Sequence, residues 1–162
     1  MGKNHTIAVG EAAPEFALES AAGETVRLSD FRGKSEVVVF FYPKNNTPAC
    51  TIEACSFRDS YEAFRAAGAE VIGISADSTS SHQSFRQNFK LPFLQLSDPG
   101  GKVAALYGVP KTLGVFPGRT TFVIDRQGVV RHVFSSQLQP TKHVKEALQV
   151  LESLRAERAE TT

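Results

Sequence analysis

The chain has 162 residues, 41% of them apolar, which suits one domain of 1–162 with its own core and excludes an intrinsically disordered chain. Its 18 Lys and Arg residues nearly balance 17 Asp and Glu residues, so the net charge of +1 favours neither nucleic acid nor an acidic membrane surface as a partner. No apolar run reaches the roughly 18 residues of a membrane span, and residues 1–10 lack the apolar centre of a signal peptide, so we expect a soluble, unprocessed, cytoplasmic protein.

The first half of the chain predicts a hairpin followed by a strand, a helix and a second strand. Apolar residues on both sides of Gly23 predict an N-terminal β-hairpin, and residues 36–42 predict a strand covered on both faces. Thr47 and Pro48 are typical of a helix start, and this helix is expected to end at Gly68. A strand at 71–75 follows, which predicts a right-handed parallel unit.

The second half predicts an antiparallel addition to that parallel unit. The expected elements are a helix at 78–89, a strand at 93–96, a helix at 102–107, strands at 120–125 and 129–134 joined by a tight turn, and a helix from Pro140. The polar residues 155–162 are expected to fray. The fold class is therefore α/β, with a mixed central β-sheet flanked by helices and an N-terminal β-hairpin extension.

The two cysteines are the unusual feature of the composition. Cys50 falls in the first turn of the predicted helix, where unsatisfied N–H groups and the helix dipole favour a thiolate. A free cysteine is more often a small buried apolar residue. Thr47 upstream, the stiffening Pro43 and Pro48, and the second cysteine, Cys55, favour a reactive thiol instead.

The spacing of Cys50 and Cys55 restricts how they can pair. Two residues five apart in an ideal α-helix have Cα atoms about 8.6 Å apart, whereas a disulfide spans at most about 7 Å. If they pair at all, the first turn must unwind, which favours a disulfide that forms and breaks over a static one. Two cysteines with four scattered histidines, His5, His82, His132 and His143, make a metal site an unfavoured alternative.

The segment from Phe40 to Arg58 resembles the active site of the peroxiredoxins, in particular the bacterioferritin comigratory protein or peroxiredoxin Q branch. Pro43, Thr47 and Cys50 match the family pattern Pro-x-x-x-Thr-x-x-Cys. The resemblance covers nearly the whole chain, including Leu96-Ser97-Asp98-Pro99, Tyr107-Gly108-Val109 and the segment 118–125. Ala49 departs from it, because glycine is common there in this branch.

This resemblance implies a thioredoxin-like fold and a thioredoxin-dependent thiol peroxidase of hydrogen peroxide and organic hydroperoxides. It makes Cys50 the peroxidatic cysteine, which becomes a sulfenic acid, and Cys55 the resolving cysteine of an intramolecular disulfide. Arg119 and Thr47 would complete the active site, with the Cys50 N–H as a backbone donor. Glu53 either orients Arg119 or merely complements the helix dipole. The implied partners are a hydroperoxide and thioredoxin or a similar dithiol, with no cofactor, and we expect a monomer.

Two alternatives belong to other functional classes. A thioredoxin-fold disulfide exchanger would consume no peroxide, but Cys-x-x-Cys is absent while Thr47 and Arg119 are present. A non-catalytic redox sensor or binding module would use the same disulfide as a switch, and rapid turnover with thioredoxin would argue against it.

Overall fold

A seven-stranded mixed sheet forms the centre of the fold. The computed structural model describes residues 6–112, 116–117, 119–135 and 139–161. The strand order is β2-β1-β5-β4-β3-β8-β9, and only the β3–β4 and β4–β5 pairs are parallel, as the mixed sheet predicted from the sequence requires. The strands are β1 Ala17–Ser20, β2 Thr25–Arg27, β3 Glu36–Phe41, β4 Ala69–Ser75, β5 Leu94–Ser97, β8 Thr120–Ile124 and β9 Val130–Ser135, with β6 Lys111–Thr112 and β7 Phe116–Pro117 paired separately.

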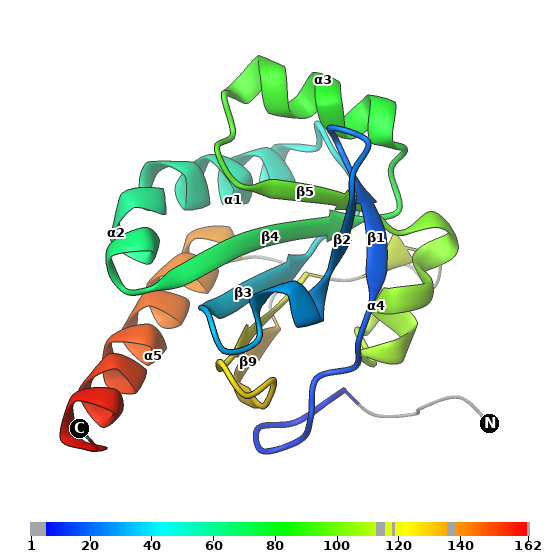
Figure 1. Cartoon of the computed structure of the whole chain (residues 1–162). Helices are drawn as coiled ribbons and strands as arrows, with labels where there is room; N and C mark the ends of the chain where they lie inside the picture. Colours follow the sequence, from blue (N-terminus) through cyan, green and yellow to red (C-terminus); the bar gives the residue numbers. More distant parts are fainter. Residues whose placement is uncertain (1–5, 113–115, 118, 136–138, 162) are drawn as a thin grey trace.

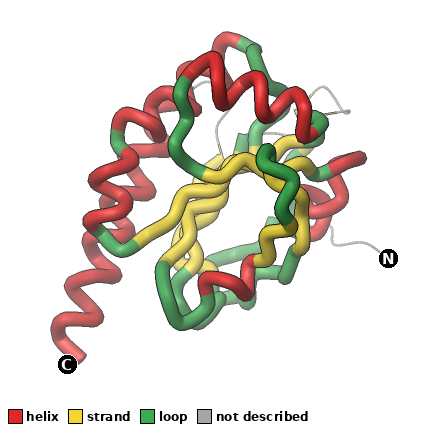
Figure 2. The backbone as a smooth tube through the Cα atoms, turned by 45° about the horizontal axis from the view of Figure 1, so that its top comes forward, coloured by secondary structure: helices red, strands yellow, loops and turns green. Residues whose placement is uncertain are grey.

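Helices cover the sheet from outside (Figure 2). They are η1 Leu28–Phe31, α1 Pro48–Asp59, α2 Tyr61–Ala66, α3 Thr79–Phe89, η2 Pro99–Gly101, α4 Lys102–Leu106 and α5 Pro140–Thr161. Helices α1, α2 and α5 lie together at the left of Figure 1, whereas α4 lies at the right. Within the part of the chain that the structure describes, no helix is both long and apolar enough to cross a membrane.

The alternation of side chains along β3 divides the core into two clusters. Val38 and Phe40 face the cluster formed with α1, α2, α3 and α5, whereas Val39 and Phe41 face the cluster formed with α4 and the N-terminal segment. All six residues of β3 are buried, as expected for a strand covered on both faces. The loop before α1 therefore begins at the end of a fully buried strand.

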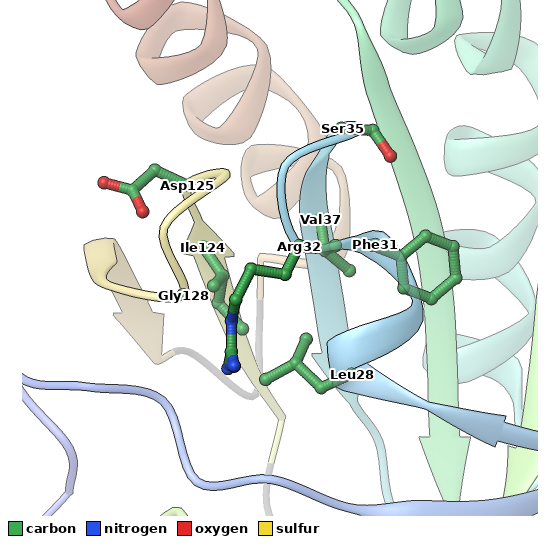
Figure 3. A pocket seen from close by; sticks show the side chains of 8 residues that line it. All are labelled: Leu28, Phe31, Arg32, Ser35, Val37, Ile124, Asp125 and Gly128. Carbon is green, nitrogen blue, oxygen red and sulfur yellow. The ribbon is translucent and has the colours of Figure 1, made fainter.

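Glycine is required at two positions, Gly73 by a close contact and Gly128 by its backbone conformation. A Cβ atom on Gly73 of β4 would lie 2.8 Å from the ring of Phe40, so only glycine lets this ring lie across the strand. Gly128, in the β8–β9 turn, has φ +83°, and a Cβ there would lie 3.1 Å from the Arg32 guanidinium. Figure 3 shows Arg32 beside Gly128 in a small pocket at the start of β3. This pocket contains neither cysteine.

One helix in the first half of the chain differs from the sequence prediction, whereas the N-terminal hairpin is confirmed. The single helix expected from Pro48 to Gly68 is broken at Ser60, whose φ of −102° and ψ of 4° are not helical. The N-terminal hairpin of β1 and β2 also joins the main sheet, because β1 pairs with β5.

The C-terminal helix α5 extends to Thr161, and fraying of its polar end stays a prediction. An ion pair between Glu157 and Arg131, with a nitrogen–oxygen distance of 2.9 Å, ties this last part of α5 to β9. Thr162 lies outside the described residues.

Replacing Phe57 with alanine should destabilise the fold by about 3–5 kcal/mol, because it deletes a large buried ring. Phe57 is fully buried on α1 and stacks on Phe40 with ring centroids 4.4 Å apart. Urea unfolding followed by far-ultraviolet circular dichroism measures the change. Ile52→Ala on the same helix is the control, since Ile52 is 52% exposed and should cost less than about 1 kcal/mol. Equal losses in both variants would contradict this assignment of the core.

Candidate active site

The loop between β3 and α1 has a defined backbone that presents the start of the helix. Asn46 has φ 66°, a left-handed conformation that asparagine tolerates better than most residues. Thr47 is extended and is the N-cap of α1, and Pro48 occupies the first turn, where its missing N–H is not needed. The Thr47 hydroxyl donates to the Lys44 carbonyl oxygen at 2.9 Å, so its proton is held within the loop.

Asn45 anchors this loop to the rest of the domain. Its backbone N–H donates to an Asp77 carboxylate oxygen at 2.8 Å, and its side-chain oxygen accepts a hydrogen bond from the Tyr42 hydroxyl at 2.6 Å. Its side-chain nitrogen lies 3.1 Å from Nδ1 of His82, which is itself buried against Gln95. Burial lowers the pKa of His82, which favours the neutral ring in this network. The loop that leads to Cys50 is therefore fixed against Asp77 and the first turn of α3.

Cys50 lies in the first turn of α1 and contacts Arg119. The thiol is 1% exposed, and Nη2 of Arg119 donates to its sulfur at 3.3 Å. The sheet explains how residues 69 positions apart meet. In the antiparallel β3–β8 pair Phe41 faces Thr120, so Arg119, directly before Thr120, lies beside the end of β3 where the chain turns toward Cys50.

Glu53 lies one helical turn after Cys50 and forms an ion pair with the same arginine. Its Oε1 accepts from Nη1 of Arg119 at 2.7 Å, and both side chains are buried. Burial raises the pKa of Glu53 to about 8, although the charge and hydrogen bond of Arg119 oppose this shift. Burial also works against the charge of Arg119, but Glu53 and Cys50 hold its pKa above the ordinary value, so the guanidinium remains a cation. Arg119 thus donates hydrogen bonds to both Glu53 and Cys50.

Cys55 stands apart from this buried group. Both cysteines are free, and Cys55 is partly exposed on the intact helix α1. Ile52, between the two cysteines, is 52% exposed and leaves an apolar side chain on the surface there. The structure therefore brings Cys50, Arg119 and Glu53 into direct contact, with Thr47 and Pro43 in the adjoining loop and Cys55 beyond one further turn.

Two groups of this region were not identified from the sequence. His143 lies behind Glu53, with Nδ1 3.5 Å from Glu53 Oε2, and the Asn45–His82 anchor supports the loop. His143 precedes the buried Ala147 by four positions, so the apolar stripe of the last helix contained a signal for its burial. Among the described side chains, no group of three or more histidine, cysteine or acidic residues is arranged to hold a metal ion.

The sequence matches the AhpC/TSA family over residues 9–133. The chain belongs to this family. A chloroplastic peroxiredoxin Q of Suaeda salsa is 54% identical over 149 residues, which are 91% of this chain and 69% of that protein. A chloroplastic peroxiredoxin Q of Sedum lineare is 52% identical over 150 residues, which are 92% of this chain and 80% of that protein. The resemblance to the peroxiredoxin Q branch is thereby confirmed.

Solved structures of the AhpC/TSA family agree with the sequence comparison. The crystal structure of the peroxidoxin BcpB from Mycobacterium tuberculosis superposes with a TM-score of 0.84 at 37% identity, over 91% of this chain and 97% of that one. The thioredoxin-like fold is therefore confirmed, and this member of the AhpC/TSA family is a thiol peroxidase.

The expected cytoplasmic location is wrong. The AhpC/TSA relatives from Suaeda salsa, Sedum lineare and Arabidopsis thaliana are all named chloroplastic, which points away from the cytoplasm. The sequence inference rested on composition and on the missing features of a secretory signal. Subcellular location is determined by targeting segments, so it cannot be inferred from the composition of a folded domain.

Proposed function

We propose that Cys50 is the peroxidatic cysteine of this thiol peroxidase. The Cys50 thiolate attacks the terminal oxygen of a hydroperoxide, the O–O bond breaks, and the alkoxide or hydroxide takes up a proton and leaves as alcohol or water. Cys50 retains the transferred oxygen as a sulfenic acid. The single observation that carries this proposal is the hydrogen bond from Arg119 Nη2 to the buried Cys50 sulfur at 3.3 Å.

Arg119 and the loop supply the electrostatic part of this step. Negative charge on the thiolate moves to the leaving oxygen in the transition state, and the fixed Arg119 cation lies where it can stabilise both ends of that transfer. The Cys50 N–H lies in the first turn of α1, where N–H groups have no partner within the helix. Because the Thr47 proton goes to Lys44, the Thr47 oxygen is suited to accept the O–H of the hydroperoxide.

Cys55 is proposed to resolve the sulfenic acid. Its thiol attacks the Cys50 sulfur, a disulfide forms, and the sulfenic oxygen leaves as water. In intact α1 the two Cα atoms stand at a spacing of about 8.6 Å, which exceeds disulfide reach. The first turn of α1 must therefore unwind, while the Asn45 anchor holds the preceding loop.

A thioredoxin-type dithiol is proposed to reduce the disulfide. Two electrons and two protons from that dithiol restore both thiols, and the dithiol becomes a disulfide. The exposed apolar Ile52 lies between the two cysteines and offers contact area to such a reductant. Because both cysteines belong to one chain, a monomer suffices for the whole cycle.

Cys55→Ser should separate the first step from the second. We expect one equivalent of peroxide to remove two hydrogens from the wild-type mass, and to add one oxygen to the variant, because its sulfenic acid has no partner. Intact-mass spectrometry after rapid quenching measures both. Ser153 is exposed on α5 and carries no thiol, so Ser153→Ala is a neutral control that should lose two hydrogens like the wild type. An oxygen adduct in the wild type and no disulfide would contradict the role of Cys55.

A further inference from the structure

His143 completes a buried row of contacts behind the reactive cysteine. Its side chain is fully buried near the start of α5, and its Nδ1 lies 2.7 Å from the Thr121 hydroxyl and 3.5 Å from Glu53 Oε2. Glu53 Oε1 accepts from Arg119 at 2.7 Å, and Arg119 donates to Cys50 at 3.3 Å. The row therefore connects α5 and β8 to the thiol on α1.

Both carboxyl oxygens of Glu53 are buried, and a buried carboxyl oxygen is costly without a hydrogen-bond or charged partner. Oε1 has Arg119, whereas the buried Oε2 has no hydrogen-bond partner among the described residues. A buried carboxylate oxygen without a partner costs about 1–3 kcal/mol or more, and a carboxyl that rotates to relieve this would draw the guanidinium with it. Nδ1 of His143 lies 3.5 Å from Oε2, a distance that allows an electrostatic contact.

The 3.5 Å contact between Glu53 and His143 is electrostatic and not a hydrogen bond, because the same Nδ1 lies 2.7 Å from the Thr121 hydroxyl. Thr121 fixes the imidazole ring in this place, and the ring nitrogen faces Oε2 of Glu53. Burial raises the pKa of Glu53, although the charge and hydrogen bond of Arg119 oppose this shift. A polar nitrogen fixed beside Oε2 therefore favours the orientation in which Oε1 faces Arg119.

We propose that His143 is a positioning residue for the peroxidase reaction, which holds Glu53 so that Arg119 stays directed at the sulfur of Cys50. The inference rests on the proposed function of Cys50. It concerns the attack on peroxide and not the later disulfide step, because Cys50 leaves Arg119 when the first turn of α1 unwinds. His143 does not touch the reacting atoms and acts through Glu53.

A packing role for His143 predicts a different result. The ring lies 4.6 Å from the ring of Phe134 in an edge-on contact, so it also fills space between α5 and β9. His143→Leu keeps most of this volume and removes the polar group. His143→Asn loses the ring but keeps an amide at the distance from the backbone where Nδ1 lies. The two variants therefore separate the polar role from the packing role.

Rapid quenching with intact-mass spectrometry measures sulfenic acid formation in the Cys55→Ser background and disulfide formation in the Cys55 protein. We expect His143→Leu to slow the peroxide step about tenfold, and His143→Asn to stay within about threefold of wild type. The rate constant for conversion of the sulfenic acid to the disulfide, measured at a peroxide concentration that makes the first step fast, should change less than about twofold in both variants. Circular dichroism establishes that each variant is folded at the assay temperature.

The outcomes distinguish this inference from the proposed function. If the parent protein forms no sulfenic acid on Cys50, the proposed function itself fails. If it does, and His143→Leu reacts as fast as wild type or His143→Asn is the slower variant, the positioning role is overturned and packing explains the burial of His143. Should both steps slow equally in His143→Leu, the residue supports the fold and not the direction of Arg119.

Discussion

Cys50→Ser is expected to lower peroxide reduction by more than about 10³-fold, to the level of buffer alone, because it removes the nucleophile. A serine hydroxyl stays protonated near neutral pH and is a far weaker nucleophile than a thiolate. Serine is close to cysteine in size, and Cys50 is 1% exposed, so the hydroxyl should occupy the place of the sulfur next to Arg119. Peroxide remaining after mixing with an excess of protein and dithiol measures the loss.

The matched control for Cys50→Ser is Cys55→Ser. That variant should consume one equivalent of peroxide at the wild-type rate, since Cys55 does not contact Arg119 in the group around Cys50. Circular dichroism should show the same helix content in both variants. Peroxide consumption by Cys50→Ser at more than a few per cent of the wild-type rate would contradict the assignment of the nucleophile and direct attention to Cys55.

The sheet was predictable because its sequence signals are local. Residues 36–41 are apolar except for Glu36, and the run identified the central strand that feeds the active site. Thr47 and Pro48 marked the start of α1 to the residue, because a cap and a proline depend on nearby backbone geometry. Cys50 could therefore be placed in the first turn of a helix from its neighbours alone.

The helix ends were less predictable because tertiary contacts decide them. The apolar stripe of α1 continues through Tyr61 and Phe64, so the pattern gave no sign of the break at Ser60. Asp59 and Ser60 both compete for backbone hydrogen bonds, which is a weak local signal for such a break. At the other end of the chain, the ion pair between Arg131 and Glu157 joins residues 26 positions apart.

The support of the active site was also hidden from the sequence. His143 meets Glu53 only because α5 packs beside α1, and Asn45 meets His82 only because the loop crosses the start of α3. Neither contact follows from spacing along the chain. Arg119 was predicted through the family resemblance, whereas its physical cause, the β3–β8 register that places Thr120 opposite Phe41, became visible only in the fold.

Arg119→Met should slow the peroxide step by about 10²- to 10³-fold, the usual loss when one fixed donor to a developing charge is removed. Methionine keeps the length and apolar bulk of the side chain, so the change removes chiefly the charge and its hydrogen bonds. The Cys50 sulfur loses its donor at 3.3 Å, and Glu53 loses its ion pair at 2.7 Å. Because a lone buried carboxylate is costly, Glu53 should become protonated, which limits the damage to the fold.

Arg119→Lys is the control that separates charge from geometry. Arginine donates from Nη1 to Glu53 and from Nη2 to Cys50. A lysine has one ammonium nitrogen, so it cannot donate to both groups with the geometry of the planar guanidinium. We therefore expect Arg119→Lys to lie between wild type and Arg119→Met in the rate of sulfenic acid formation, measured by rapid quenching. Urea unfolding of both variants tests whether they remain folded. If folded Arg119→Met forms sulfenic acid within about threefold of the wild-type rate, the cation contributes little to peroxide cleavage and the electrostatic part of the mechanism is wrong.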